Sequence, residues 1–249
     1  MRGRWPLRGR AAVVFSEGMP RSRPSARSGV AHHAPRGRVA GGLLGCGIAY
    51  PVAYVVANDV LAAARYPGYS RIDQAVSELS ATGAPTRRFL VRMLPVFTGL
   101  SVAYGIGVWN AAGRRRALRT TGLVLLASGA TGIAWLPFPM SSRDVIARGA
   151  ATGSDTGHVV LSGLTVAEIL ALFGAGAGAF GTRFRIYSLA CGAVVLLSGA
   201  LTSRQAVKLV TGQPTPRMGF YERISIGTWL QWMAALATIL LREQRLTGR

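Results

Sequence analysis

Six long apolar runs, separated by short polar segments, follow one another along the chain. Each is close to the ~20 residues that a helix needs to cross a hydrocarbon layer of ~30 Å. A helix on the surface of a water-soluble bundle would carry polar residues at every third or fourth position, and residues 122–139 and 189–200 do not. The pattern therefore predicts an all-α fold, a polytopic membrane helix bundle with six transmembrane helices. We expect these helices at Val39–Ala63, Phe89–Ala112, Thr120–Pro139, His158–Gly181, Ile186–Ser203 and Ile224–Leu241.

The first long loop contains a shorter helical pattern. Ser70 precedes Asp73 by three positions, the spacing at which a hydroxyl and a carboxyl group cap the start of a helix. Ile72, Val76 and Leu79 then recur at a spacing that places them on one face of a helix. We therefore expect a short amphipathic helix lying on the outer membrane surface.

Small residues recur at four-residue steps inside the predicted spans, where they allow helix backbones to approach closely in lipid. Gly41, Gly45 and Ala49 in the first span and Gly174 and Gly178 in the fourth have this spacing. The third span carries Ser128, Gly129 and Gly132, and we expect packing contacts at all of these residues. These steps need no functional explanation, because tight packing of the bundle accounts for them.

The composition agrees with a membrane protein. Half of the 249 residues are hydrophobic and 15% are charged, whereas about a quarter of the residues of an ordinary soluble domain are charged. Two cysteines are too few for a small domain held together by disulfides. The 29 basic residues outnumber the nine acidic ones and give a formal net charge of +20.

The basic residues concentrate on one side of the predicted bundle. Residues 1–38, 113–119, 182–185 and 242–249 hold 18 of the 29 basic residues but only two of the nine acidic ones. Cytoplasmic segments of membrane proteins carry this excess of Lys and Arg. We therefore expect a multi-pass protein of the cell (plasma) membrane with both termini in the cytoplasm. Because topology accounts for the charge, we expect no nucleic-acid partner.

The chain divides into three parts by composition. Residues 1–38 are rich in Arg, Pro, Ser and Gly and are predicted to be a disordered basic cytoplasmic tail. Residues 39–242 form the six-helix transmembrane domain, and residues 243–249 form a short cytoplasmic C-terminal tail. Membrane lipid is the expected partner of the domain.

Polar residues gather at the outer boundary of the predicted spans, and one stripe continues inward. His158 opens the fourth predicted helix, and Ser162, Thr165 and Glu168 follow it on one side. Glu168 lies ~15 Å along the axis from His158, which places its carboxyl group near the middle of the membrane. A carboxyl group at that depth faces a cavity or a partner.

Three stretches together resemble a known family. They are YPGYSRIDQAVSELSATGAPT in the first outer loop, FPMSSRD after the third predicted helix and GFYERISIGTW at the start of the sixth, with His158 at the start of the fourth. Over residues 40–241 the sequence resembles the uncharacterised bacterial integral membrane proteins grouped as domain of unknown function 998. The resemblance implies a six-span architecture and no established activity. It also implies polar outer-side positions at Ser77, Glu78, Asp144, His158, Glu222 and Arg223.

The hypothesis that we favour is a non-enzymatic membrane protein with a structural, binding or transport role. In it the outer polar groups form a latch, with Glu78 or Asp144 paired to Arg223. His158 would cap its helix or bond to a loop. A lipid-like or small-molecule ligand would be bound through Arg223, Glu222, Glu168 and Asp59.

The first alternative is a membrane-embedded enzyme that acts on a lipid or lipid-linked substrate at the outer face. His158 would be the general base, with Asp144 or Glu78 as its orienting carboxylate. Ser77 would be the nucleophile and Arg223 would stabilise developing negative charge. We expect no metal and no cofactor, because the membrane domain contains a single histidine.

The second alternative is a proton-coupled small-molecule transporter in which Glu168 titrates. The simpler interpretation of Glu168 is a hydrogen bond to a Ser, Thr or Tyr of a neighbouring helix, and we favour it. The sequence leaves the oligomeric state open.

Overall fold

The computed structural model describes residues 34–247, with side chains from Val39 to Leu246. Within this range the chain is helical and contains no strand. The elements are α1 (Ala34–Val55), η1 (Val56–Ala62), α2 (Ala63–Arg65), η2 (Val76–Ser80), α3 (Arg87–Ala112), α4 (Arg116–Ala134), α5 (Arg143–Ala147), α6 (Gly153–Ala177), α7 (Thr182–Val210) and α8 (Met218–Thr247). The first helix begins inside the segment predicted as a tail, and residues 1–33 of that prediction lie outside the described residues.

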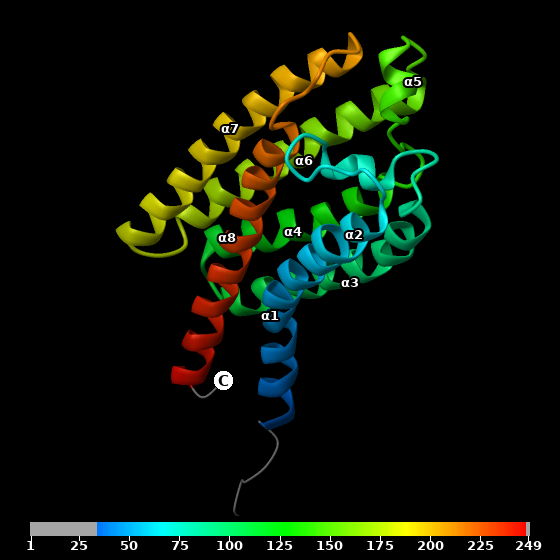
Figure 1. Cartoon of the computed structure of the whole chain (residues 1–249). Helices are drawn as coiled ribbons and strands as arrows, with labels where there is room; N and C mark the ends of the chain where they lie inside the picture. The colour runs from blue at the N-terminus through cyan, green and yellow to red at the C-terminus, as the bar shows by residue number, and fades with distance from the viewer. Residues whose placement is uncertain (1–33, 248–249) are drawn as a thin grey trace, which may run out of the picture. The chain divides into compact units, whose positions relative to one another are not determined.

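The six long helices pack in a closed ring that follows the chain order. Helix α3 contacts α1 and α4, and α6 contacts α4 and α7. Helix α8 contacts both α7 and α1, and so closes the ring (Figure 1). Tyr104 of α3 is fully buried, and its hydroxyl donates to the carbonyl of Met233 in α8 across the centre of the bundle (3.1 Å).

The outer surface of the ring is apolar, as a membrane requires. Large hydrophobic side chains are widely exposed on it, including Val159 (70%), Leu197 (66%) and Ile186 (62%). All six long helices have the length and composition of membrane spans. The prediction of a six-span membrane helix bundle is therefore confirmed.

Most of the predicted helix boundaries differ from the structure by four to seven residues, and three of the differences have consequences. Helix α4 ends at Ala134, five residues before the prediction, because Pro137 and Pro139 follow in an irregular segment. Helix α6 begins at Gly153, so His158 lies in its second turn instead of opening it. The fifth span, predicted to be the shortest, extends over Thr182–Val210.

Glycines allow neighbouring helices to come into contact. Some of these glycines differ from those that the sequence predicted. A Cβ atom at Gly107 would lie 2.9 Å from the backbone carbonyl carbon of Leu43 in α1. Gly129, as predicted, faces another helix: a Cβ atom there would lie 2.7 Å from a methyl group of Val102 in α3. Gly45 and Gly174, however, face open space.

We expect Gly107→Ala to lower the melting temperature in detergent, because the added methyl group meets backbone atoms of α1 that cannot rotate away. Overpacking of this kind costs roughly 1–3 kcal/mol. Gly99→Ala is the matched control, since Gly99 lies on the same helix and faces open space. It should be neutral or stabilising by up to about 1 kcal/mol. Equal melting temperatures for the two variants would contradict this packing.

Candidate functional site

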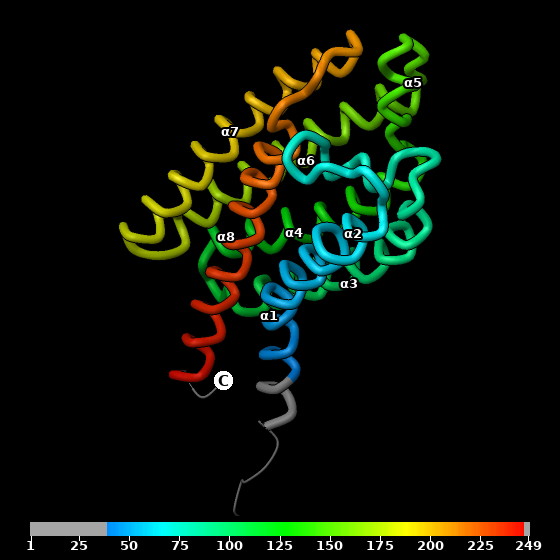
Figure 2. Tube along the Cα trace, viewed as in Figure 1, coloured from blue at the N-terminus to red at the C-terminus, as the bar shows by residue number. Residues whose placement is uncertain are grey.

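Three connecting segments cover one end of the helix ring, and we call them together the cap: residues 66–86, 135–152 and 211–217. The first of these, coloured cyan in Figure 2, leaves α2 and crosses toward the start of α8. There the Phe220 N–H donates to the Ile72 carbonyl (2.9 Å). Any Cβ atom at Gly219 would overlap the Gln74 carbonyl oxygen, so only glycine allows this approach. All three stretches that carry the family resemblance contribute to the cap or to its contacts.

Three groups of hydrogen bonds, which we call joints, connect the cap segments to one another and to the helices. The first joint is centred on Arg223, in the second turn of α8. Its Nε donates to Oδ1 of Asp59 in η1 (2.7 Å). Its Nη1 donates to the carbonyl of Arg71 (2.8 Å), and its Nη2 donates to the hydroxyl of Tyr69 (3.0 Å). One guanidinium group therefore ties α8, η1 and the first cap segment together.

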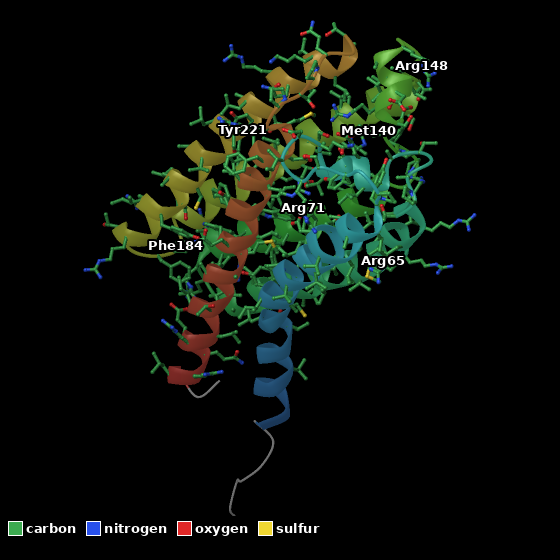
Figure 3. All side chains as sticks on the ribbon, viewed as in Figure 1. Arg65, Arg71, Met140, Arg148, Phe184 and Tyr221 are labelled. Atoms are coloured by element: carbon green, nitrogen blue, oxygen red, sulfur yellow. The ribbon has the colours of Figure 1, made fainter. Side chains whose placement is uncertain are left out.

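Two further side chains complete this joint. The Arg71 guanidinium (labelled in Figure 3) donates two hydrogen bonds to the carbonyl of Asp59 in η1 (2.7 and 3.0 Å). The Tyr69 hydroxyl donates to the Ala75 carbonyl (2.8 Å). Burial raises the pKa of Tyr69 to about 12, although its bond with Arg223 acts in the opposite direction. Tyr69 therefore stays a hydrogen-bond donor at any physiological pH.

Glu78 and Arg143 form the second joint, between two cap segments. The Glu78 side chain is only 3% exposed, and its two oxygens accept from Nη2 and Nε of Arg143 (2.6 and 3.0 Å). This paired geometry is the strongest that an arginine and a carboxylate can adopt. The Arg143 Nη1 also donates to the Thr215 hydroxyl (2.8 Å), and Thr215 donates to the Asp73 carbonyl (2.9 Å). The third cap segment is thus joined as well.

Asp155, in the first turn of α6, forms a third joint. Its Oδ1 accepts from the Ser141 N–H (2.6 Å), and its Oδ2 accepts from the Ser141 hydroxyl and the Thr152 N–H (2.8 and 2.7 Å). The positive end of the helix dipole also stabilises a carboxylate at this position. Asp155 therefore holds the second cap segment to the start of α6.

The short amphipathic helix of the first loop is shorter than predicted. Ser70 and Asp73 do bond as expected (3.0 Å), but the regular part is only the 3₁₀ helix Val76–Ser80. Val76 and Leu79 are buried, whereas Ile72 is 57% exposed. The reason is that Tyr69 and Arg223 bond to carbonyls of this loop that a continuous helix would need for itself.

The predicted catalytic residues do not come together as a nucleophile and its base. His158 Nδ1 lies 3.1 Å from the Phe138 carbonyl, and its ring packs edge-on against Trp135. The Ser77 hydroxyl donates to the sulfur of Met140 (3.5 Å). The Asp144 side chain is exposed. The contact of His158 with a loop agrees with the latch hypothesis. The same hypothesis paired Arg223 with Glu78 or Asp144, and this pairing is wrong, because Arg223 pairs with Asp59.

The space next to the Asp59–Arg223 pair is filled by the protein itself. The Glu222 carboxylate accepts from the Val76 N–H (2.7 Å). Further along the helices, the Tyr50 ring packs at a tilt against Phe97 and edge-on against Trp229, with centroids 5.9 and 5.5 Å apart. Tyr54 packs on the same rings. Packed aromatic rings, rather than an open channel, therefore lie between the helices beneath this part of the cap.

Glu168 is separate from the cap. Its Oε1 accepts a hydrogen bond from the Thr131 hydroxyl of α4 (2.6 Å). This confirms the simpler interpretation of a bond between neighbouring helices.

The sequence did not single out several residues that carry the cap: Tyr69, Arg71, Gln74, Arg143, Asp155 and Thr215. Arg143 directly precedes Asp144, so the residue that carries the contact stands next to the carboxylate that the resemblance indicated. One signal was available: Val76 and Leu79 flank Glu78, and a glutamate that is buried with such neighbours needs a cation. Asp155 also stands three residues after Thr152, the spacing of a capping box.

A cleft of ≈ 560 Å³ opens beside Arg143 and is lined by Ser70, Asp73, Gln74, Pro214, Thr215 and Pro216. Polar side chains contribute to its lining, but Arg143 already donates four hydrogen bonds within the protein. Among the described residues, no three His, Cys, Asp or Glu side chains lie close enough to hold a metal ion together.

The chain was compared with protein families, curated proteins and solved structures. The comparisons with curated proteins and with solved structures each found no match. The family described as "Protein of unknown function (DUF998)" matches residues 47–239. That range contains most of the helix ring and every residue of the three joints. The chain therefore belongs to the DUF998 family of proteins of unknown function.

Proposed function

We propose that this is a non-catalytic integral membrane protein whose cap is a structural latch, with a structural or ligand-binding role in the membrane. The observation that carries the proposal is that the two arginines use most of their N–H donors within the protein. Arg223 donates five hydrogen bonds within the protein, and Arg143 donates four. A guanidinium group that stabilises a reaction must have donors free for the substrate.

The positions of the other candidates support the same proposal. An activated serine needs a base within hydrogen-bond reach, and Ser77 contacts a thioether instead. His158 bonds to a backbone carbonyl and packs against an indole ring. Both contacts suit residues that fix a loop.

The charge distribution supports an orientation. The end of the ring opposite the cap carries the Arg-rich turns, including Arg114, Arg115 and Arg116, and both ends of the described chain. We propose that this end faces the cytoplasm of a cell whose plasma membrane holds the protein, and that the cap lies outside.

We expect Arg143→Gln to lower the melting temperature in detergent, because it leaves the buried Glu78 carboxylate without its cation. The loss should be about 2–3 kcal/mol. Glu78→Gln should cost a similar amount, and the double variant should cost less than the sum of both. Arg148→Gln is the matched control, since Arg148 lies just after the same short helix and, among the described residues, its side chain bonds only to the Asp144 carbonyl. It should change stability by less than about 0.5 kcal/mol.

We expect Arg223→Lys to release the first cap segment although the positive charge remains. A lysine ammonium group can pair with Asp59 but cannot reach Tyr69 and the Arg71 carbonyl at the same time. Trypsin should therefore cut after Arg71 about tenfold faster than in the unaltered protein, since a lost charged hydrogen bond is worth about 1.5–3 kcal/mol. Arg204→Lys, at an exposed position of α7, should leave the rate unchanged.

These variants also separate the latch from catalysis. A latch predicts that any biological activity of the protein falls in parallel with stability across the Arg143 and Arg223 variants. If His158→Gln or Ser77→Ala abolished activity while the melting temperature stayed the same, the proposal would be wrong and the enzyme hypothesis would replace it.

A further inference from the structure

Gln231 presents an amide group on the lipid-facing surface of α8. It lies nine residues after Glu222 and eleven before Arg242, or ~14 Å and ~17 Å along the helix axis. These distances place it near the middle of a ~30 Å hydrocarbon layer. The Gln231 side chain is exposed, and it makes no hydrogen bond to any residue between Val39 and Leu246. An amide without a partner is costly in hydrocarbon.

A groove runs from Gln231 toward the turn between α6 and α7. It forms where α7 and α8 diverge (Figure 1), near Phe184 (Figure 3). Its volume is ≈ 440 Å³, and it is lined by Arg183, Phe184, Tyr187, Gln231, Ala235 and Ile239. Apart from Arg183 at one end and the amide at the other, its walls are largely apolar.

Small residues flank the amide on the same face of α8. Gly227 and Ala235 lie four residues before and after Gln231. Gly227 is exposed, and a Cβ atom there would meet no other atom within 4 Å. Small residues on either side of a polar one allow a second helix to approach and reach the polar group.

We infer that this face of α8 and its groove form the interface with a second copy of the chain. Two copies inserted in the same direction are related by a twofold axis along the membrane normal. Each residue then lies at the same depth as its equivalent, and residues close to the axis meet their own equivalents. A glutamine amide is both donor and acceptor, so Gln231 and Gln231 of a second copy satisfy each other.

The alternatives satisfy the amide less well. A phospholipid in the groove could place its phosphate at Arg183, but at the depth of Gln231 it offers only acyl chains, which cannot hydrogen-bond. A different membrane protein would need a polar group of its own at this depth. A second copy supplies that group by symmetry.

The experiment is energy transfer between donor-labelled and acceptor-labelled full-length chains in phosphatidylcholine vesicles, at increasing ratios of lipid to protein. We expect the unaltered protein to show transfer that disappears on dilution. Gln231→Leu and Gly227→Leu should each weaken association at least tenfold. Gln231→Asn, which keeps an amide, should weaken it less than Gln231→Leu. Leu164→Ala is the matched control, because Leu164 is a lipid-facing residue near the middle of α6 (46% exposed).

The melting temperature of each variant in detergent shows whether the protomer still folds, and none of these lipid-facing substitutions should lower it much. An unaltered protein that shows no transfer at any dilution would overturn the inference. So would association that Gln231→Leu leaves intact. Native mass spectrometry that finds a monomer carrying a phospholipid, lost in Gln231→Leu, would assign the groove to lipid and also overturn the inference.

Discussion

Buried negative charge is the constraint on which the cap depends. The Glu78 carboxylate is almost wholly removed from solvent, and Asp59 is largely so. A buried carboxylate is tolerated only when a cation and further hydrogen bonds satisfy it. Arg143 and Arg223 supply these cations from other parts of the chain, and so the same two interactions that neutralise charge also determine where the loops lie.

Each arginine does more than pair with a carboxylate. Arg223 also bonds to the loop carbonyls of Arg71 and Gln74, and Arg143 reaches the segment before α8 through Thr215. Irregular loops lack the internal hydrogen bonds of a helix, so their backbone groups need partners elsewhere. Guanidinium groups suit this task because five donors point in fixed directions. A rigid cap of irregular backbone at a membrane boundary follows from this chemistry.

Below the cap, the helices are held mainly by close approach, and charge contributes at the far end, where Arg115 pairs with Glu243 (3.0 Å). Gly107 lies against α1, and Gly129 lies against α3. Few polar bonds cross between helices; those of Tyr104 to Met233 and of Thr131 to Glu168 are examples. In lipid the surroundings of the helices are as apolar as their side chains, so packing and such bonds hold the helices together. This division explains why the polar residues of the family resemblance gather at the cap.

The sequence by itself determined the number of spans, their order and the boundary at which polar residues collect, because apolar length and charge are local properties of the chain. It also singled out Glu78, Asp59, Glu222 and Arg223 as polar positions of interest. It did not determine that Asp59 pairs with Arg223 or that Glu78 pairs with Arg143, since residues separated by 164 and 65 positions meet only after the loops have folded back. Nor did it show which glycines contact a neighbouring helix. Gly45 and Gly107 both lie within apolar spans, but Gly107 faces another helix and Gly45 faces open space. Pairing and direction depend on helix rotation and loop path, which only the tertiary structure decides.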